Sequence, residues 1–339
     1  MHERRAAGAS ISAATGIRTL GKGALIVVTA LASSQTAFAQ DKWPTKAVTV
    51  IVPQAAGGGN DAVARVFAQE FSKVIGQPAV IDNRPGAGGN IGTAIAARAP
   101  KDGHSIMITL SSAHVVNPWL YKSPGFDPVK DFEPITPIAV GTYLLVSNPQ
   151  FPARNVKELI ALAKAKPGSI QYASAGNGTL NHLMGEMLKT AAGIDIQHVP
   201  FKGAAAAVTD VVAGRLPISF QSMPSALPFM QSGKLRVIAV ANEKRVKALP
   251  DVPAIGETVK GYGATPWYGM FAPAGTPKPL IAQIHAATLK ALASKDVQEK
   301  LAVQGAEVWT TTPEKFGEII RTELPQWQKI VKESGAQVD

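Results

Sequence analysis

The hydrophobic and polar positions of this chain follow two periods in turn, one typical of strands and one typical of helices. In residues 47–52 β-branched side chains alternate along an apolar run, which predicts a strand. After a glycine-rich stretch, apolar residues recur at helical spacing on one face, at Val63, Val66, Phe67, Phe71, Val74 and Ile75. Because this order of strand, loop and helix returns along the chain, we predict an α/β fold with mostly parallel sheets flanked by helices.

The same patterns predict the other elements. Asn155 and Glu158 have the spacing of a capping box that opens a helix, and Pro325 is expected to kink or break the last helix. The apolar run 138–147 is expected to cross into a second domain, and 267–272 to return from it. Further strands are predicted at 79–82, 105–110, 170–172, 197–201, 216–220 and 235–241, and further helices at 91–99, 155–166, 204–213, 225–231, 278–292 and 313–334, with another that carries Leu180 to Leu188.

Two glycine-rich loops lie between a predicted strand and a predicted helix, PQAAGGGND at 53–61 and ASAGNGT at 173–179. Glycines without Cβ atoms let backbone N–H groups approach a ligand directly. The start of a helix also stabilises an anion through its unpaired N–H groups and its dipole. We interpret the two loops as a carboxylate cradle; the alternative for the first is a tight turn with Asn60 or Asp61 as N-cap.

Other polar loops also follow predicted strands, at 111–114, 202–203 and 221–222. In open α/β sheets, ligands bind at the carboxyl ends of the strands. The sequence therefore predicts a ligand-binding site made of Gln54, Ala55, Ala56, Gly57, Gly58, Gly59, Asn60, Asp61, Ser111, Ser112, His114, Ser174, Ala175, Gly176, Asn177, Thr179, Lys202, Gly203, Gln221 and Ser222.

Several other kinds of site do not fit the sequence. The loop NRPGAGGNIG at 83–92 departs from the G-x-G-x-x-G dinucleotide spacing. The 6 His residues form no short-spaced zinc signature, and there is neither a G-x-S-x-G elbow nor a phosphate-binding P-loop. The net charge is +10, but its Lys and Arg residues are scattered, which argues against nucleic-acid binding. We expect no catalytic residue, no metal and no cofactor. We therefore expect that the protein is not an enzyme.

The first 39 residues have the pattern of a signal peptide. Arg4 and Arg5 are basic, residues 24–32 form a short apolar run, and Ala37 to Ala39 fits an A-x-A cleavage site. The apolar run is too short to span a bilayer well, and the general secretory route is favoured over the twin-arginine route. With 0 Cys there is no disulfide or lipid-anchoring cysteine. A soluble periplasmic protein is the expected outcome.

Several motifs, in this order, resemble the Bug family, the periplasmic solute-binding components of tripartite tricarboxylate transporters. The resemblance covers residues 43–339, nearly all of the chain after the predicted signal peptide. The motifs are PQAAGGGND, NRPGAGGNIG, YKSPGFDPVKDFEPI, YASAGNGT, HVPFKG, SALPFMQSGKLRVIAV, ALPDVP and WYGMFAPAGTP.

The resemblance implies a two-lobed, type II-like periplasmic binding protein fold, with a first lobe at 41–142 plus 265–339 and a second at 143–264. It implies a small carboxylate ligand, gripped by the loops 54–61 and 174–179, partly through ordered waters. A monomer would deliver the ligand to membrane permease subunits. The alternatives are a free-standing carboxylate sensor that presents its closed form to a signalling receptor and, after it, an exported enzyme.

The chain departs from the family at two positions. Gln54 follows the loop proline where an aromatic residue is frequent, which favours a more polar ligand. Gln221 stands where an Asp is frequent in the family. If that Asp pairs with the amino group of amino-acid ligands, its replacement argues against an α-amino acid.

Overall fold

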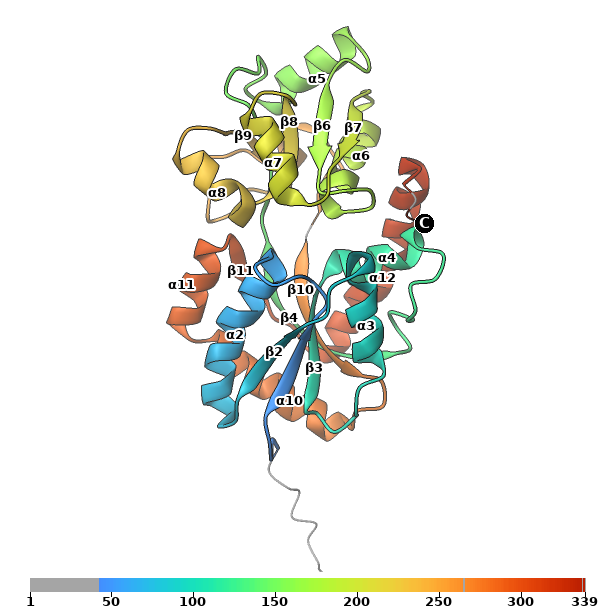
Figure 1. The fold of residues 1–339 in the computed structure, drawn as a ribbon, viewed down its shortest axis with the longest axis vertical. Helices are drawn as coiled ribbons and strands as arrows, with labels where there is room; N and C mark the ends of the chain where they lie inside the picture. The colour runs from blue at the N-terminus through green and yellow to red at the C-terminus, as the bar shows by residue number, and fades with distance from the viewer. Residues whose placement is uncertain (1–42, 265, 337, 339) are drawn as a thin grey trace, which may run out of the picture. The chain divides into compact units, whose positions relative to one another are not determined.

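The structure is a computed structural model and describes residues 43–264, 266–336 and 338. The predicted signal peptide lies outside the described residues. In Figure 1 the strands form two sheets. The first has the order β11 (Ala306–Val308), β4 (Phe132–Gly141), β10 (Trp267–Pro273), β3 (Ser105–Leu110), β1 (Val48–Val52), β2 (Ala79–Asn83). The second has the order β7 (Gln197–Pro200), β6 (Gln171–Ser174), β8 (Ile218–Ser222), β5 (Tyr143–Ser147), β9 (Arg236–Val240).

Helices connect the strands and cover the sheets. They are α2 (Gly59–Ile75), η1 (Ala87–Gly89), α3 (Asn90–Ala97), η2 (Ser112–Val116), α4 (Asn117–Leu120), α5 (Val156–Ala165), α6 (Leu180–Ala192), α7 (Ala204–Val212), α8 (Met223–Gln231), α9 (Ile255–Thr258), α10 (Lys278–Leu292), α11 (Lys295–Val303) and α12 (Pro313–Ser334). The predicted α/β fold, with sheets flanked by helices, is confirmed.

Both sheets are mixed, whereas the sequence predicts mostly parallel ones. In the first sheet β1 pairs parallel with β2 and β3, but β10 pairs antiparallel with β3 and β4, and β11 with β4. In the second, β6 pairs parallel with β7 and β8, whereas β5 pairs antiparallel with β8 and β9. Three of the antiparallel strands, β4, β5 and β10, are those that carry the chain between the sheets.

Two layers of helices bury the first sheet, as its alternating side chains require. Val48, Val50 and Val52 pack into the core under α2, α10 and α11. Ile51 points the other way, into the core shared with α3 and α12. This period of two explains why an all-apolar strand lies here, because both of its faces are buried.

The second sheet is covered in the same way. Helices α7 and α8 pack on one face, where Leu144 and Val146 are buried, and α6 packs on the other, where Leu145 is buried. Helix α12, although its strand partner β4 belongs to the first sheet, also contacts α6. Helix α12 therefore packs both against the first sheet and against a helix that covers the second sheet.

Two local predictions have different outcomes. Asn155 is the N-cap of α5 and accepts the N–H of Glu158 at 3.0 Å, so the predicted helix start is confirmed. The capping box is only half formed, because the Glu158 carboxylate accepts the N–H of Arg154, at 2.7 Å. Pro325 does not break α12, which runs unbroken from 313 to 334. Its apolar face is buried on both sides of the proline, at Phe316, Ile320, Leu324, Trp327 and Val331, and this burial offsets the loss of one hydrogen bond.

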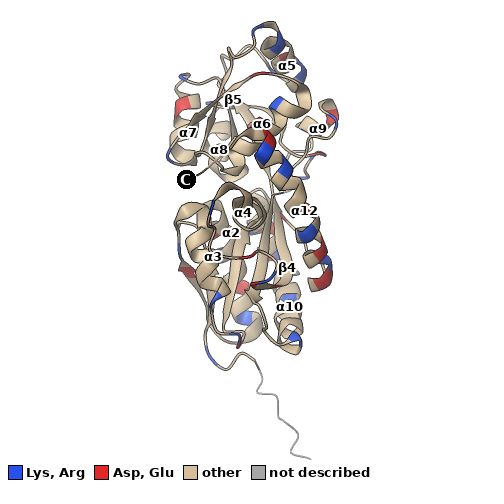
Figure 2. Ribbon diagram, turned by 90° about the vertical axis from the view of Figure 1, so that its right-hand side faces the viewer, with Lys and Arg blue, Asp and Glu red and all other residues tan. Residues whose placement is uncertain are grey.

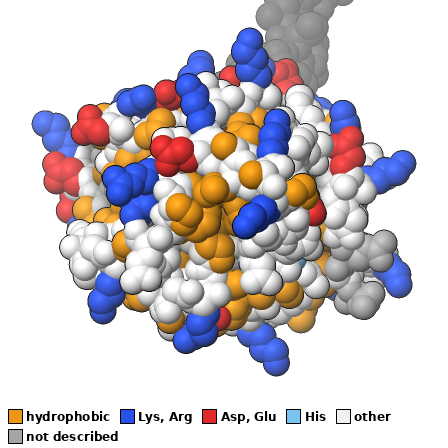
Figure 3. Space-filling view, turned by 90° about the horizontal axis from the view of Figure 1, so that it is seen from above, with side chains coloured by type: hydrophobic (Ala, Val, Ile, Leu, Met, Phe, Trp, Pro, Cys, Tyr) orange, Lys and Arg blue, Asp and Glu red, His pale blue; other side chains and the backbone are white. Residues whose placement is uncertain are grey.

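Charged side chains of both signs are interspersed over the helices (Figure 2) and around a small apolar area at the end of the molecule seen in Figure 3. On the faces seen in these two views, the basic side chains of the described residues do not gather into a stripe that would follow a nucleic-acid backbone. In the described part of the chain, no helix combines the length and the apolar character that a membrane span requires.

Candidate functional site

A cavity of about 310 Å³ lies where loops from both sheets meet. Its walls come mainly from the loops at the carboxyl ends of β1, β2, β3 and β6, the edge where ligands bind in open α/β sheets. We take it as the candidate site. It is lined by Pro53, Gln54, Ala55, Pro85, Gly86, Gly88, Gly89, Leu110, Ser112, Asn117, Tyr121, Tyr143, Asn177, Gly178, Thr179, Leu180 and Asn181.

Asp61 holds the glycine loop after β1 through hydrogen bonds. One carboxylate oxygen accepts the N–H of Gly57 at 2.8 Å and Nε of Arg65 at 2.9 Å, and the other accepts Nδ2 of Asn83 at 3.0 Å. Burial raises the pKa of Asp61, but these hydrogen bonds outweigh it and hold the pKa below its usual value. Asp61 therefore shapes the loop and does not line the cavity.

Helix α2 begins at Gly59 with Gly58 as its N-cap. The alternative in which Asn60 or Asp61 is the N-cap is wrong, because both lie inside the first turn. The Asn60 amide instead donates to the side-chain oxygen of Gln54 and to the carbonyl of Ile108.

From the loop 54–61, Gln54 and Ala55 line the cavity, whereas Ala56, Gly57, Gly58, Gly59, Asn60 and Asp61 do not. The amide nitrogen of Gln54 lies close to Gly89, since a Cβ added to Gly89 would be 2.8 Å from it.

A second glycine-rich segment, residues 85–92, forms the neighbouring wall. Gly86, Gly88 and Gly89 have φ values of 129°, 65° and 108°, and Gly89 is the N-cap of α3. A Cβ on Gly92 would lie 2.5 Å from the carbonyl of Arg84, so only glycine fits this close packing. The sequence predicts this segment only as a loop before a helix. Its cluster of glycines was the signal that could have identified it as a wall of the site.

The loop after β3 contributes Ser112 and Asn117, whereas Ser111 and His114 do not line the cavity. His114 is fully buried, with its ring stacked 4.1 Å from that of Phe271 and Nε2 2.9 Å from the carbonyl of Pro128. Burial lowers the pKa of His114 to about 3, so the ring is neutral at pH 7. In this structure it is part of the core.

The loop between β6 and α6 gives Asn177, Gly178 and Thr179 to the cavity. Ser174, Ala175 and Gly176 do not line it. The buried Ser174 hydroxyl accepts the N–H of Gly176 at 3.1 Å, and the Thr179 hydroxyl donates to the carbonyl of Gly176 at 2.7 Å. These bonds fix the path of the loop.

Four further predicted residues, Lys202, Gly203, Gln221 and Ser222, do not line the cavity. Gly203 supports the neighbouring loop, because its N–H donates to the carbonyl of Ala175 at 3.0 Å. Gln221 is fully buried and donates to the hydroxyl of Ser219 at 2.8 Å.

Two tyrosines that the sequence analysis missed line the cavity, Tyr121 and Tyr143. Burial raises the pKa of both phenols, that of Tyr143 to about 12, so both are neutral hydrogen-bond donors at pH 7. Tyr143 is the first residue of β5 and lies in none of the motifs named above, whereas Tyr121 opens the motif YKSPGFDPVKDFEPI, which was not interpreted as part of the site.

The lining contains no Asp, Glu, Lys, Arg or His. Helices α3 and α6 begin next to lining residues, at Asn90 and Leu180. Their N-termini carry positive partial charge and favour an anion by roughly 0.3–1 kcal/mol each in exposed cases, and more when buried. Among the described residues, no group of His, Cys, Asp or Glu could hold a metal ion. The site is thus suited to an anion bound by dipoles and neutral donors.

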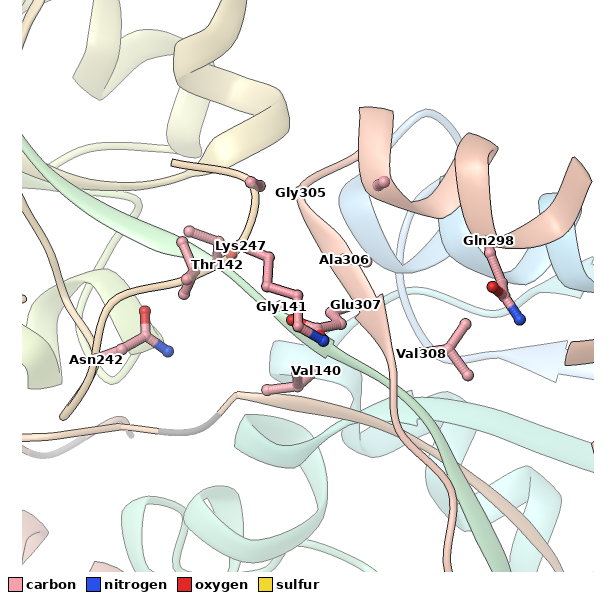
Figure 4. A pocket seen from close by; sticks show the side chains of 13 residues that line it. Val140, Gly141, Thr142, Asn242, Lys247, Gln298, Gly305, Ala306, Glu307 and Val308 are labelled. Carbon is pink, nitrogen blue, oxygen red and sulfur yellow. The ribbon is translucent and has the colours of Figure 1, made fainter. Parts of the chain in front are cut away.

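A larger cavity of about 470 Å³ lies elsewhere, beside the β4–β5 connection (Figure 4). It is lined by Gly141 and Thr142 of that connection, by the segment after β9, and by α11 and β11. Lys247 and Glu307 on its wall form an ion pair. It lacks the glycine loops and helix N-termini that mark the smaller cavity, so volume alone does not make it the ligand site.

The chain is similar in sequence and in structure to several known proteins. Residues 63–336 match the profile of the tripartite tricarboxylate transporter family receptor. The chain is 34% identical to protein BugT of Bordetella pertussis over 302 residues, 88% of this chain and 92% of BugT. The structure of Rpa4515 of R. palustris with adipate matches with a TM-score of 0.79 and 34% identity, over 87% of this chain and 100% of that one.

A second solved structure, MatC of Rhodopseudomonas palustris with bound malate, has a TM-score of 0.75 and 31% identity. The match covers 85% of this chain and 100% of MatC.

Proposed function

The chain belongs to the tripartite tricarboxylate transporter receptor family, and from this premise we propose that it captures a small dicarboxylate in the 310 Å³ cavity and delivers it to a membrane permease. The family is one of solute-binding receptors, so the prediction that the chain is not an enzyme is confirmed. We further propose that the protein is exported to the periplasm and acts there as a monomer.

One observation carries the proposal. The cavity has an uncharged lining of glycine-rich loops, amides and hydroxyls, and two helices begin at it. A carboxylate requires hydrogen-bond donors, which backbone N–H groups at helix starts provide without a buried Arg. Because the cavity is lined from both sheets, carboxylates at the two ends of one ligand would find donors on both sides. The adipate and malate bound by the similar proteins are ligands of this kind.

We also propose that the ligand is enclosed by rotation of one lobe against the other. The lobe boundaries that we propose are 142/143 and 264/265. The first is supported by the strands, since β4 of the first sheet and β5 of the second are separated by Thr142 alone. A short connection of this kind is where a hinge absorbs backbone rotation. The ligand would thereby be shielded from water before release to the permease.

A thermal-shift screen tests the proposal. The purified protein, unfolded and refolded to remove bound ligand, is heated with adipate, malate, other di- and tricarboxylates, and amino acids. A ligand at 100 times its Kd stabilises by about 2.7 kcal/mol, which corresponds to several degrees of Tm. The control is 1,6-hexanediol, which keeps the adipate chain without its charges. If no carboxylate in the screen raises the Tm, the proposed function is refuted.

Gly89 offers a sharper prediction, with Gly76 as its matched control. Both have positive φ, 108° and 71°, so alanine strains the backbone at either position by about 1–2 kcal/mol. A Cβ on Gly89 would press on Gln54 at 2.8 Å at the cavity wall, whereas a Cβ on Gly76 meets nothing within 4 Å. We expect G89A to lose more stability than G76A, because only its Cβ meets neighbouring atoms, and only G89A to lose carboxylate affinity by calorimetry. Equal affinities would show that this wall does not touch ligand.

A further inference from the structure

A stacked pair of histidines lies next to the β6–α6 loop and contacts it from outside the cavity. His182 is on α6 and His198 on β7, and their ring centroids are 3.8 Å apart with an interplanar angle of 19°. His182 is buried, and His198 is only partly exposed. Neither ring lines the cavity, so ligand contact does not explain their placement.

Each histidine makes one hydrogen bond to the loop. The N–H of Gly178 donates to Nδ1 of His182 at 3.1 Å, and Nε2 of His198 pairs with the hydroxyl of Ser174. Because Nδ1 of His182 accepts, it carries no proton, so the ring is neutral with its proton on Nε2. The two bonds hold opposite ends of the segment 174–178, whose Asn177 and Gly178 line the cavity.

We propose that His182 and His198 are positioning residues, whose neutral rings hold the loop 174–179 in its ligand-binding form. Protonation of Nδ1 of His182 removes the acceptor for Gly178, and a charge on either ring opposes a charge on the other. Acidification therefore releases the loop and lowers ligand affinity. This inference rests on the proposed function in so far as it concerns carboxylate binding; the positioning of the loop is testable without ligand.

The groups around the pair are consistent with neutral rings. On α6, Glu186 lies 3.9 Å from Nε2 of His182, but it also pairs with Lys189 at 3.0 Å and accepts the hydroxyl of Tyr172 at 2.6 Å. From neighbouring segments, Tyr262, which follows α9, and Glu333 of α12 line a small cavity with Glu186. Burial is the main cause that lowers the pKa of both histidines to about 4, with Lys189 adding to it and Glu186 opposing it for His198.

The test compares three variants of the pair and one control variant with the wild type. In H182N the side-chain oxygen of asparagine replaces Nδ1 as an acceptor but does not titrate, whereas H182L removes the acceptor. In H198Q the side-chain amide of glutamine, which can donate or accept, pairs with the Ser174 hydroxyl in place of Nε2 and does not titrate. H285N is the matched control, because His285 bonds to the carbonyl of Thr311 at 2.9 Å, far along the chain from the loop.

The first readout needs no carboxylate. Amide hydrogen exchange of Gly178 at pH 7 is expected to be at least about tenfold faster in H182L than in the wild type, as the loss of one buried hydrogen bond implies. The exchange rate of Gly178 should return toward the wild-type rate in H182N and should equal the wild-type rate in H285N. Equal exchange in H182L and the wild type would overturn the positioning role, even if every carboxylate binds.

The second readout is the Kd for adipate and malate between pH 7.5 and pH 3.5. Dividing the wild-type Kd by that of the H182N/H198Q double variant at each pH cancels protonation of the ligand itself. We expect this ratio to rise about threefold by pH 4 and further below it. A ratio that stays flat while H182L melts earlier would mean that the histidines are structural only. If neither carboxylate binds at any pH, the proposed function fails, and the exchange result still decides the loop.

Discussion

Replacing Asp61 by alanine is expected to lower the free energy of unfolding by about 3 kcal/mol, because three hydrogen bonds to a buried carboxylate are lost. The N–H of Gly57 is left without its acceptor, and the loop after β1 loses the group that holds it. If the loop must be reordered when ligand binds, the roughly 3 kcal/mol that the hydrogen bonds supplied must come from the binding free energy. The carboxylate affinity then falls by about 100-fold. Urea unfolding and calorimetry measure the two effects.

The pH dependence of this effect has a definite sign. The pKa of Asp61 in the folded protein is held below its usual value. Its contribution to stability is therefore fully present above the pKa of the unfolded chain, and is lost as the pH falls through the lower pKa of the folded state. The stability difference between the wild type and D61A should shrink in strong acid.

Asp82 provides the control for D61A. It pairs with Arg84 at 2.9 Å, but the two side chains are 31% and 54% exposed. Exposed ion pairs contribute about 0–1 kcal/mol, so D82A should leave stability and affinity nearly unchanged. D61A with wild-type affinity would contradict the role of Asp61 in holding the loop.

The elements of the fold could be predicted well where the pattern is long and regular. The period of apolar residues places α10 at 278–292 and α12 at 313–334, the same limits as in the structure. Strand direction could not be predicted, because an apolar run buried on both faces looks the same in parallel and antiparallel pairs. Helix α11 and strand β11 were missed, since both are short and their pattern is weak.

Only part of the candidate site could be predicted from the sequence, and the reason is physical. Strand–glycine loop–helix units are local, so Gln54, Ala55, Asn177 and Thr179 could be found in the sequence, and they line the cavity. Tyr143 lines it because the chain crosses between sheets next to it, and this is a property of tertiary structure. Conversely, His114 looked like a site residue because it follows a strand, but its ring turns into an aromatic core.

Replacing Glu323 by glutamine is expected to stabilise the protein at pH 8 by about 2–3 kcal/mol. Glu323 on α12 accepts Nε1 of the fully buried Trp267 at 2.9 Å. Burial raises the pKa of its carboxyl to about 7, although hydrogen bonds from Trp267 and Trp327 lower it in part. Above that pH the folded protein must hold a partly buried carboxylate, and glutamine keeps the acceptor oxygen without the charge.

The gain should depend on pH in one direction. Because the folded-state pKa lies above that of the unfolded chain, the protonated acid stabilises the fold at low pH, and this stability is lost as the pH rises through about 7. Urea unfolding should therefore show E323Q and wild type to be equal near pH 4 and different at pH 8. E323A should gain less, since Trp267 loses its acceptor, and E318Q, at an exposed position of the same helix, should show no such gain. A gain of equal size at pH 4 and pH 8 would mean that packing, not the buried charge, distinguishes glutamine from glutamate here.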